Sequence, residues 1–477
     1  MSEHHWQPVM REALGEIWTS DEAYRTLWTL CDEFGHRFGG SASEHAAAAY
    51  LEEAFRRLGL RVWRETFPVY SWERGECFFA LAVPVERSFS AIALPYTGVA
   101  DIEAPIVDAG AGEADDFARL GQAARGAMVL VDAERDIPGQ TSSHRTDKYR
   151  RAVEAGAVAC LFTNRNPGQL HITGALYARN PGGPTPLDHT APIPGLGLTY
   201  EAGEALRRLA VRGPLRGRIR TRNRVFRSLA HNIVAELPGA ERANEIILLG
   251  AHYDGHDIAQ GALDNAAGTA VLLATARALA PFAGRLPRTL RFVCFACEEL
   301  GLLGSWRHAE SYQTADGPRL VFMLNLDGAG RGQGGSELLT VAGDEEVARA
   351  FTGLAHHWHG AFAVRDAISA HSDHFPFFLA GYPVATLQSR DATRDMIGRG
   401  WGHTEADTVD KVTLTGLRSS AAVTVQLALW LATAEHVPGG RRSPEAIRTL
   451  LETSGLVDAL SHHWGRANRA DLAPGGV

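Results

Sequence analysis

The sequence predicts an α/β fold, because strand-like apolar runs and helix-like segments alternate regularly from about residue 228 to residue 435. Polar residues of the kind that bind metals directly follow several of these runs, and open α/β sheets place their ligands at such strand ends. The region from about 80 to 225 differs, because short apolar segments alternate there with Gly and Pro turns around one helix-like segment. This change predicts a separate, smaller domain that is α/β or mostly β.

Composition and charge narrow the function classes. The 477 residues are enough for two or three domains, and 45% hydrophobic with 21% charged residues is typical of a globular protein. A net charge of −8 argues against nucleic acid as the main partner. The first 18 residues lack the pattern of a signal peptide, and no apolar run is long enough to span a membrane. We therefore expect a cytoplasmic protein with no membrane association; the sequence predicts no oligomeric state.

The elements follow from local patterns along the chain. A helix rich in good helix formers is expected at about 44–58, ended by Gly59, and an alternating strand at 60–72. Later strands are expected within 228–237, 246–249, 288–297, 319–326, 337–343 and 382–388. Helices are expected at 270–279, 345–360 and 419–435, and in the tail to about residue 464.

The stretch from Ile246 to Ala280 organises the candidate site. Its apolar run predicts a buried strand that ends near His252 and Asp254. Residues two apart in a strand point the same way, so these two side chains are expected to lie side by side. A histidine with a neighbouring carboxylate is a common unit of metal sites. Asp264 follows at the start of the next helix, at the same edge of the sheet.

Three further positions repeat this pattern of ligand-type residues after apolar runs. They are the pair Glu298–Glu299, then Asp327, and finally His403 in a polar loop. Adjacent buried carboxylates are costly unless a positive charge lies beside them, and a metal ion would supply it. Mixed nitrogen and oxygen ligands suit zinc, with cobalt or manganese as possible substitutes. Two ions sharing a bridging carboxylate could activate a water, and a glutamate that binds neither ion could serve as general base.

These motifs carry a family resemblance. The series GAHYD, GALDNAAG, CEELGLLGS, NLDGAG and GHTEADTVDKV resembles the zinc aminopeptidase family M28, which includes bacterial leucyl aminopeptidases and carboxypeptidase Q. The segments GAMVLVDA and IPGLGLTYEAGEAL resemble a protease-associated (PA) domain. The resemblance implies a three-layer α/β/α zinc exopeptidase domain with a mixed sheet and a smaller inserted PA-like α/β domain. It divides the chain into four parts. Residues 1–78 are the N-terminal part of the peptidase domain, and residues 79–226 are the inserted domain. Residues 227–437 are the catalytic domain, and residues 438–477 are a C-terminal helix and tail.

The resemblance also assigns metal ligands. It implies two zinc ions, with His252 and Asp327 on one, Glu299 and His403 on the other, and Asp264 bridging both.

Other roles follow from the same resemblance. Glu298 becomes the general base, and Asp254 becomes the carboxylate that orients the ring of His252. A cis peptide bond is expected between Asp264 and Asn265. Several relatives carry a tyrosine near this chain's His371 to stabilise the oxyanion, so we predict that His371 takes that role or binds substrate.

The predicted function is hydrolysis of N-terminal residues from short peptides by a metallo-exopeptidase. Three alternatives remain. The family also contains carboxypeptidases and dipeptidases, and its fold hosts glutaminyl cyclases. A non-catalytic receptor-like protein is the third alternative, although the presence of every ligand type and of Glu298 argues against it.

Overall fold

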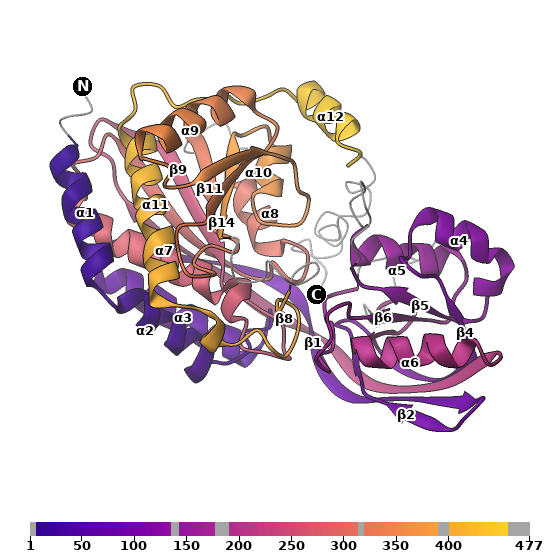
Figure 1. Cartoon of the computed structure of the whole chain (residues 1–477). Coiled ribbons are helices and arrows are strands. Elements are labelled where there is room, and N and C mark those ends of the chain that lie inside the picture. The colour runs from indigo at the N-terminus through magenta and orange to yellow at the C-terminus, as the bar shows by residue number, and fades with distance from the viewer. Residues whose placement is uncertain (1–5, 135–142, 177–189, 313–318, 390–399, 457–477) are drawn as a thin grey trace.

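The structure is a computed structural model that describes residues 6–134, 143–176, 190–312, 319–389 and 400–456. A larger part and a smaller part lie side by side, and two long strands run from one into the other (Figure 1). These are β1 (Arg61–Val83) and β8 (Leu215–Leu237), which pair antiparallel along nearly their whole length. In the described residues no helix is both long and apolar enough to cross a membrane.

The strands form one sheet of 14 strands in the order β13-β12-β14-β11-β9-β10-β8-β4-β5-β6-β7-β3, with β1 and β2 beside it. The remaining strands are β2 (Arg87–Phe89), β3 (Ala91–Ala93), β4 (Val99–Asp108), β5 (Met128–Asp132), β6 (Ala159–Thr163), β7 (Gly195–Leu198), β9 (Arg242–His252), β10 (Arg288–Phe295), β11 (Arg319–Asn325), β12 (Glu337–Val341), β13 (Ala363–Asp366) and β14 (Val384–Ser389). The α-helices are α1 (Gln7–Thr19), α2 (Glu22–Trp28), α3 (Ala42–Arg57), α4 (Ala114–Leu120), α5 (Arg145–Glu154), α6 (Tyr200–Ala210), α7 (Ala267–Leu279), α8 (Leu303–Glu310), α9 (Glu345–His357), α10 (Phe375–Leu379), α11 (Leu414–Thr433) and α12 (Pro444–Thr453).

The sheet of the larger part is mixed, as expected. Strands β10, β9, β11 and β14 run parallel, whereas β8 and β12 pair antiparallel with β10 and β14. Because β10, β9 and β11 are parallel neighbours, their carboxyl ends lie along one edge of the sheet. This edge receives the ligand-type residues that follow each strand.

Alternating burial builds the three layers of the larger part. On β9, Ile247 and Leu249 join the core beneath α1, α2, α3, α7, α9 and α11, whereas Ile246 and Leu248 join the core beneath α8, α10 and α12. Both faces of the strand are therefore buried, which explains its continuous apolar run. The sheet lies between two helical layers (Figure 1).

The smaller part repeats this arrangement. Met128 and Leu130 of β5 pack in the core that includes α6, whereas Val129 and Val131 pack in the core that includes α5. It is therefore an α/β unit. The expected limits at 78/79 and 226/227 fall inside β1 and β8, so the division at those residues remains a proposal.

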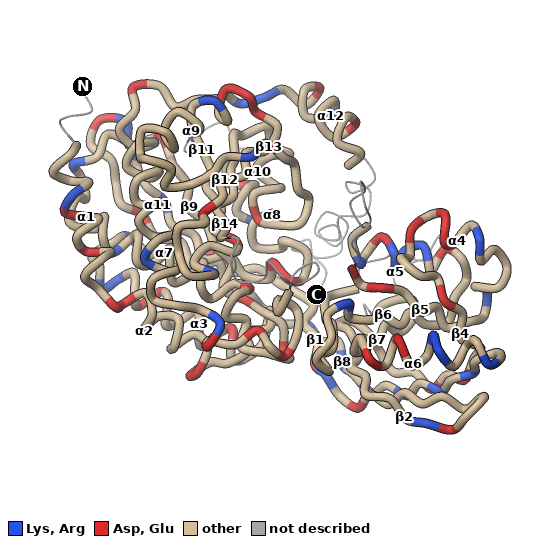
Figure 2. Tube along the Cα trace, in the orientation of Figure 1, with Lys and Arg blue, Asp and Glu red and all other residues tan. Residues whose placement is uncertain are grey.

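Charges of both signs are interspersed over the two parts (Figure 2). Between the neighbouring strands β4 and β8 they form cross-strand pairs, with Arg216 Nε 2.8 Å from Glu103 Oε1 and Arg218 Nη2 3.1 Å from Asp101 Oδ1. Exposed pairs of this kind contribute little to the stability of the fold.

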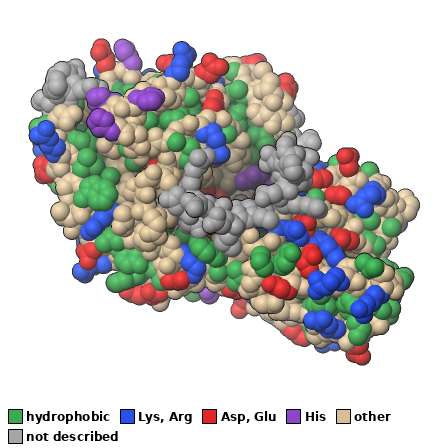
Figure 3. Space-filling view, viewed as in Figure 1, with side chains coloured by type: hydrophobic (Ala, Val, Ile, Leu, Met, Phe, Trp, Pro, Cys, Tyr) green, Lys and Arg blue, Asp and Glu red, His purple; other side chains and the backbone are tan. Residues whose placement is uncertain are grey.

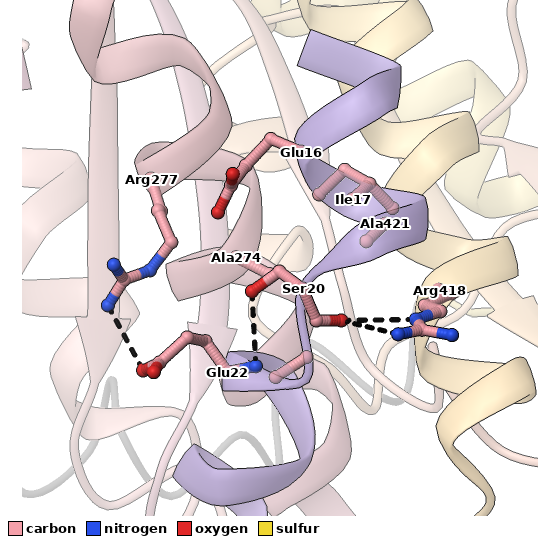
Figure 4. A pocket seen from close by; sticks show the side chains of 9 residues that line it. Glu16, Ile17, Ser20, Glu22, Ala274, Arg277, Arg418 and Ala421 are labelled. Atoms are coloured by element: carbon pink, nitrogen blue, oxygen red, sulfur yellow. Dashed lines mark hydrogen bonds and ion pairs between the residues drawn. The ribbon is translucent and has the colours of Figure 1, made fainter.

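The N-terminal helices are fixed to the helical layer of the larger part (Figure 4). Arg418 of α11 donates from Nη2 to the carbonyl of Ser20 at 2.8 Å, and Arg277 of α7 lies 3.2 Å from Glu22 Oε2. The pocket among these residues measures only about 10 Å³. It is too small for a substrate, so this region supports the fold.

Candidate metal centre

The predicted ligands meet at one edge of the sheet. His252 ends β9, and Glu298 and Asp327 follow β10 and β11, the two parallel neighbours of β9. Asp264 comes from the turn before α7, and His403 comes from the loop before α11. The surface is hollowed where the two parts of the molecule meet (Figure 3). The predicted set is thus brought together from distant segments of the chain.

Asp264 lies between two histidines. Its Oδ1 is 3.3 Å from His252 Nε2, and its Oδ2 is 3.4 Å from His403 Nε2. Each oxygen of one carboxylate therefore faces a different imidazole, as a bridging ligand requires. Asp327 Oδ1 lies 3.8 Å from His252 Nε2, and Glu299 Oε2 lies 3.1 Å from His403 Nε2. Two groups of donors result, one on each side of Asp264.

The donor set fits metal ions. Two groups of ligand-type atoms each lie within 4.8 Å of one another, namely His252, Glu298 and Asp327, and His256, Glu299 and His403. The rings of His252 and His256 are buried, and none of their nitrogens makes a hydrogen bond within the described residues. Buried polar atoms normally have partners, so unbonded imidazole nitrogens beside several carboxylates indicate cation sites.

Asp254 fixes the geometry on one side. Its two carboxylate oxygens accept hydrogen bonds from the backbone N–H groups of Glu298 and Glu299, at 3.0 and 3.1 Å. Its Oδ1 also lies 3.5 Å from His252 Nδ1. One buried carboxylate therefore holds the glutamate pair and lies beside the ring of His252, and its orienting role remains a prediction.

The electrostatics show excess negative charge. Burial raises the pKa of Glu298 well above its usual value, and the carboxylates of Glu299, Asp373 and Asp327 raise it further, although His252 opposes them. Burial lowers the pKa of His252, but Glu298 and the surrounding aspartates outweigh it and raise that pKa well above the usual range. A site of this kind favours a proton or a cation, and metal ions would supply the missing positive charge.

Two supporting residues escaped the sequence analysis. Asp407 is buried and accepts hydrogen bonds from the N–H groups of Leu263 and Asp264, at 2.6 and 3.1 Å, so it holds the turn that carries Asp264. Burial and the charge of Asp264 raise the pKa of Asp407 to about 6. The sequence signal that could have identified Asp407 was its position in the motif HTEADTVDKV. Arg331 donates from Nε to the Leu263 carbonyl at 2.7 Å and places Nη2 3.6 Å from Asp264 Oδ1.

The peptide bond between Asp264 and Asn265 is cis, as expected. The Asn265 side chain links two ligand loops, because Nδ2 donates to the Leu326 carbonyl at 2.9 Å and Oδ1 accepts from Gly328 N–H at 3.2 Å. The loops carrying Asp264 and Asp327 are therefore fixed to each other.

The smaller part contacts the metal centre directly. His403 Nδ1 lies 3.1 Å from the Thr173 carbonyl, and the Thr173 N–H donates to the His403 carbonyl at 2.9 Å. A carbonyl at Nδ1 selects the tautomer with the proton on Nδ1, whose Nε2 lone pair can bind a metal. Beside it, Glu405 accepts from His171 N–H at 2.9 Å, and its Oε1 lies 2.5 Å from His171 Nδ1. The inserted domain thus orients one candidate ligand.

We expect Glu405→Ala to loosen this contact and to weaken metal binding. Hydrogen bonds to a charged group contribute about 1.5–3 kcal/mol each, and His403 would lose part of its support. Amide hydrogen exchange at residues 171–175 should become faster, and retention of metal against a chelator should fall. Glu201→Ala is the matched control, because Glu201 accepts from Gly168 N–H at 2.8 Å and Gln169 N–H at 3.1 Å within the smaller part. Equal metal retention in the two variants would contradict the prediction.

His371 lies at the boundary between the two parts. It is exposed, and its ring stacks on His144 of the smaller part with centroids 4.0 Å apart. The adjacent Ser372 donates from Oγ to Asp327 Oδ2 at 2.5 Å. His371 is therefore one residue from a contact of the metal cluster, and its oxyanion role remains a prediction.

A cluster of buried histidines and carboxylates at the carboxyl edge of an α/β sheet is typical of metallohydrolases. Residues 232–428 match Peptidase family M28, and residues 102–206 match the PA domain. Over these residues the chain is similar to peptidase family M28 and to the PA domain.

Two relatives illustrate the range of the family. Aminopeptidase YwaD of Bacillus subtilis is 27% identical over 394 residues, which cover 82% of this chain and 80% of that protein. Carboxypeptidase Q of Xenopus laevis is 27% identical over 305 residues, which cover 61% of this chain and 62% of that protein. The chain thus spans less than two thirds of the length of this second relative.

Solved structures support the fold. A peptidase M28 precursor from Shewanella amazonensis superposes with a TM-score of 0.80 at 23% identity, covering 93% of this chain and all of the other. A zinc aminopeptidase from Bacillus subtilis, BSAP, gives a TM-score of 0.66 at 24% identity, covering 87% and 96% of the two chains. The three-layer domain and the smaller domain are therefore shared with these proteins.

Proposed function

We propose that this protein is a zinc metallo-exopeptidase that removes N-terminal residues from short peptides. The observation that carries the proposal is Asp264, whose two oxygens face His252 and His403 separately. A carboxylate so placed fits two zinc ions, one with His252 and Asp327 and one with Glu299 and His403. Cobalt or manganese would fit the same donors. Cytoplasmic location remains a prediction from the sequence.

When bound, two such ions would polarise the scissile carbonyl and lower the pKa of a water molecule. Glu298 would accept the proton from that water and then donate it to the leaving amine. The Asp254–Glu298 backbone hydrogen bond holds this glutamate at the edge of the cluster. The boundary with the smaller part, where Thr173 contacts His403, would restrict access to short substrates.

Hydrolysis of leucine amide tests the proposal. The zinc-loaded protein should cleave leucine amide but not N-acetyl-leucine amide. An aminopeptidase site has groups that bind the free amine of the substrate, and the acetylated compound leaves these groups unpaired. A chelator should abolish the activity, and added zinc should restore it. Failure to cleave leucine amide while zinc is bound would refute the aminopeptidase assignment.

A carboxypeptidase is the second candidate, and the similarity to carboxypeptidase Q favours it. Cleavage of two blocked dipeptides distinguishes the two activities. A free amine with an amidated C-terminus is a substrate for the aminopeptidase, whereas an acetylated amine with a free carboxylate is a substrate for the carboxypeptidase.

We expect His371→Ala to lower kcat while leaving the metal content unchanged. Losing one oxyanion donor typically costs about 2.7–4 kcal/mol of transition-state stabilisation. The measurement is leucine amide hydrolysis with metal analysis of the same sample. His144→Ala is the control, because it removes the stacking partner of His371 without removing the proposed donor. Unchanged turnover in His371→Ala would show that this histidine does not act on the substrate.

A further inference from the structure

A third histidine lies in the metal centre, where neither the sequence analysis nor the family resemblance assigns a ligand. His256 follows β9 by four residues, and its side chain is buried, with 4% of the residue exposed. Its Nε2 lies 2.9 Å from Glu299 Oε2, the same oxygen that is 3.1 Å from His403 Nε2. The rings of His256 and His403 meet edge to face with centroids 4.4 Å apart.

We propose that His256 is a fourth protein ligand of the ion held by Asp264, Glu299 and His403. This inference rests on the proposed metal centre, but it does not depend on which peptide bond is cleaved.

The spacing supports coordination. Tetrahedral zinc with bonds of about 2.0–2.1 Å separates neighbouring ligand atoms by roughly 3.3 Å. The separations here are 2.9 Å for His256 to Glu299, 3.1 Å for Glu299 to His403, and 3.4 Å for His403 to Asp264. His256 Nε2 and Glu299 Oε2 are within ion-pair distance, and the ring nitrogens of His256 are buried.

The loop that carries His256 is fixed by a buried arginine. Arg37 is fully buried and donates to the carbonyls of Tyr253, Gln260 and Gly261, at 2.7, 2.6 and 2.9 Å. The Arg37 carbonyl accepts from Gly255 N–H at 3.2 Å. Both ends of the loop are therefore fixed, and His256 is held near Glu299 before any ion binds.

The two ions would then be inequivalent. Four protein ligands, namely Asp264, Glu299, His403 and His256, would hold one ion the more tightly, and that ion could still take a water as a fifth ligand. The other ion has three, namely His252, Asp264 and Asp327, and this leaves a position open, as catalytic zinc sites do. We therefore expect one tightly held ion and one labile ion.

Stepwise removal of metal tests this assignment. Dialysis of the zinc-loaded full chain against increasing chelator should release metal in two separate steps. In His256→Gln the chelator concentration that removes the tightly held ion should fall by about 100-fold or more. Even losing an outer partner of a ligand costs about 10–100-fold in affinity. His308→Gln is the matched control: this buried histidine is bound to Glu65 and Tyr312 and lies outside both donor groups. His308→Gln should release metal in the same two steps as the unmodified chain.

The unmodified protein gives a second measurement that does not depend on a variant folding. X-ray absorption spectroscopy of the fully zinc-loaded protein should show three imidazole ligands in total for the two ions. Two imidazoles, or a His256→Gln release curve equal to that of the control, would overturn the assignment of His256. Failure of the unmodified chain to bind any zinc would instead refute the metal centre itself. Loss of leucine amide hydrolysis with normal metal release would refute only the proposed aminopeptidase activity.

Discussion

Glu298→Gln is expected to abolish most of the activity while both ions stay bound. The amide keeps the shape of the glutamate but cannot accept a proton, and general-base catalysis typically contributes about 10²–10⁴-fold. Burial and like charges raise the pKa of Glu298 well above its usual value, and metal ions beside it would lower that pKa again, so that the ionised carboxylate could accept a proton from water. The measurement is kcat for leucine amide together with zinc content.

Glu299→Gln is the matched comparison for Glu298→Gln. The two residues are adjacent, and both backbone N–H groups donate to Asp254, yet only Glu299 faces His403 and His256. We expect Glu299→Gln to lose metal and activity together. If Glu298→Gln also lost its metal, Glu298 would be a ligand instead of the base, which its position beside His252 and Asp327 would allow.

The sequence predicted the part of the site that depends on strand ends. A continuous apolar run marks β9 because both faces of this strand are buried, and the residues after such a strand must lie at the sheet edge. His252, Asp264, Glu299 and Asp327 could be placed together for this reason. Their roles as ligands remain predictions.

The remaining parts of the site depend on contacts between distant segments, which local patterns do not encode. Thr173 lies 230 residues before His403, and nothing in its neighbourhood indicates that its carbonyl faces that ring. His256 was overlooked because it stands in a Gly-containing loop, where a histidine is usually solvated. The loop that carries it is held by Arg37, which comes from a different part of the chain. Long-range backbone contacts of this kind become visible only in the folded structure.

Asp264→Asn should remove the stabilisation of the fold by metal. A ligand that binds only the folded state stabilises it by about 2.7 kcal/mol for each site when its concentration is 100 times its Kd. An amide at this position carries no charge and offers one oxygen, so it cannot bridge the two ions between His252 and His403. The difference in Tm between zinc and chelator should therefore shrink towards zero in the variant.

Using this difference isolates the effect of metal, because Asp264→Asn also changes the apo protein. The carboxylate lies near His252 and His403, and these contacts contribute with or without metal, so they cancel when zinc and chelator are compared within one variant. Asp257→Asn controls for the loss of a carboxylate from the segment between β9 and α7, because Asp257 pairs with Arg74 of β1 at 2.7 Å. It should retain the full shift in Tm with zinc. A full shift in Asp264→Asn as well would mean that the ions are held without a bridging aspartate, and the two-ion arrangement would have to be abandoned.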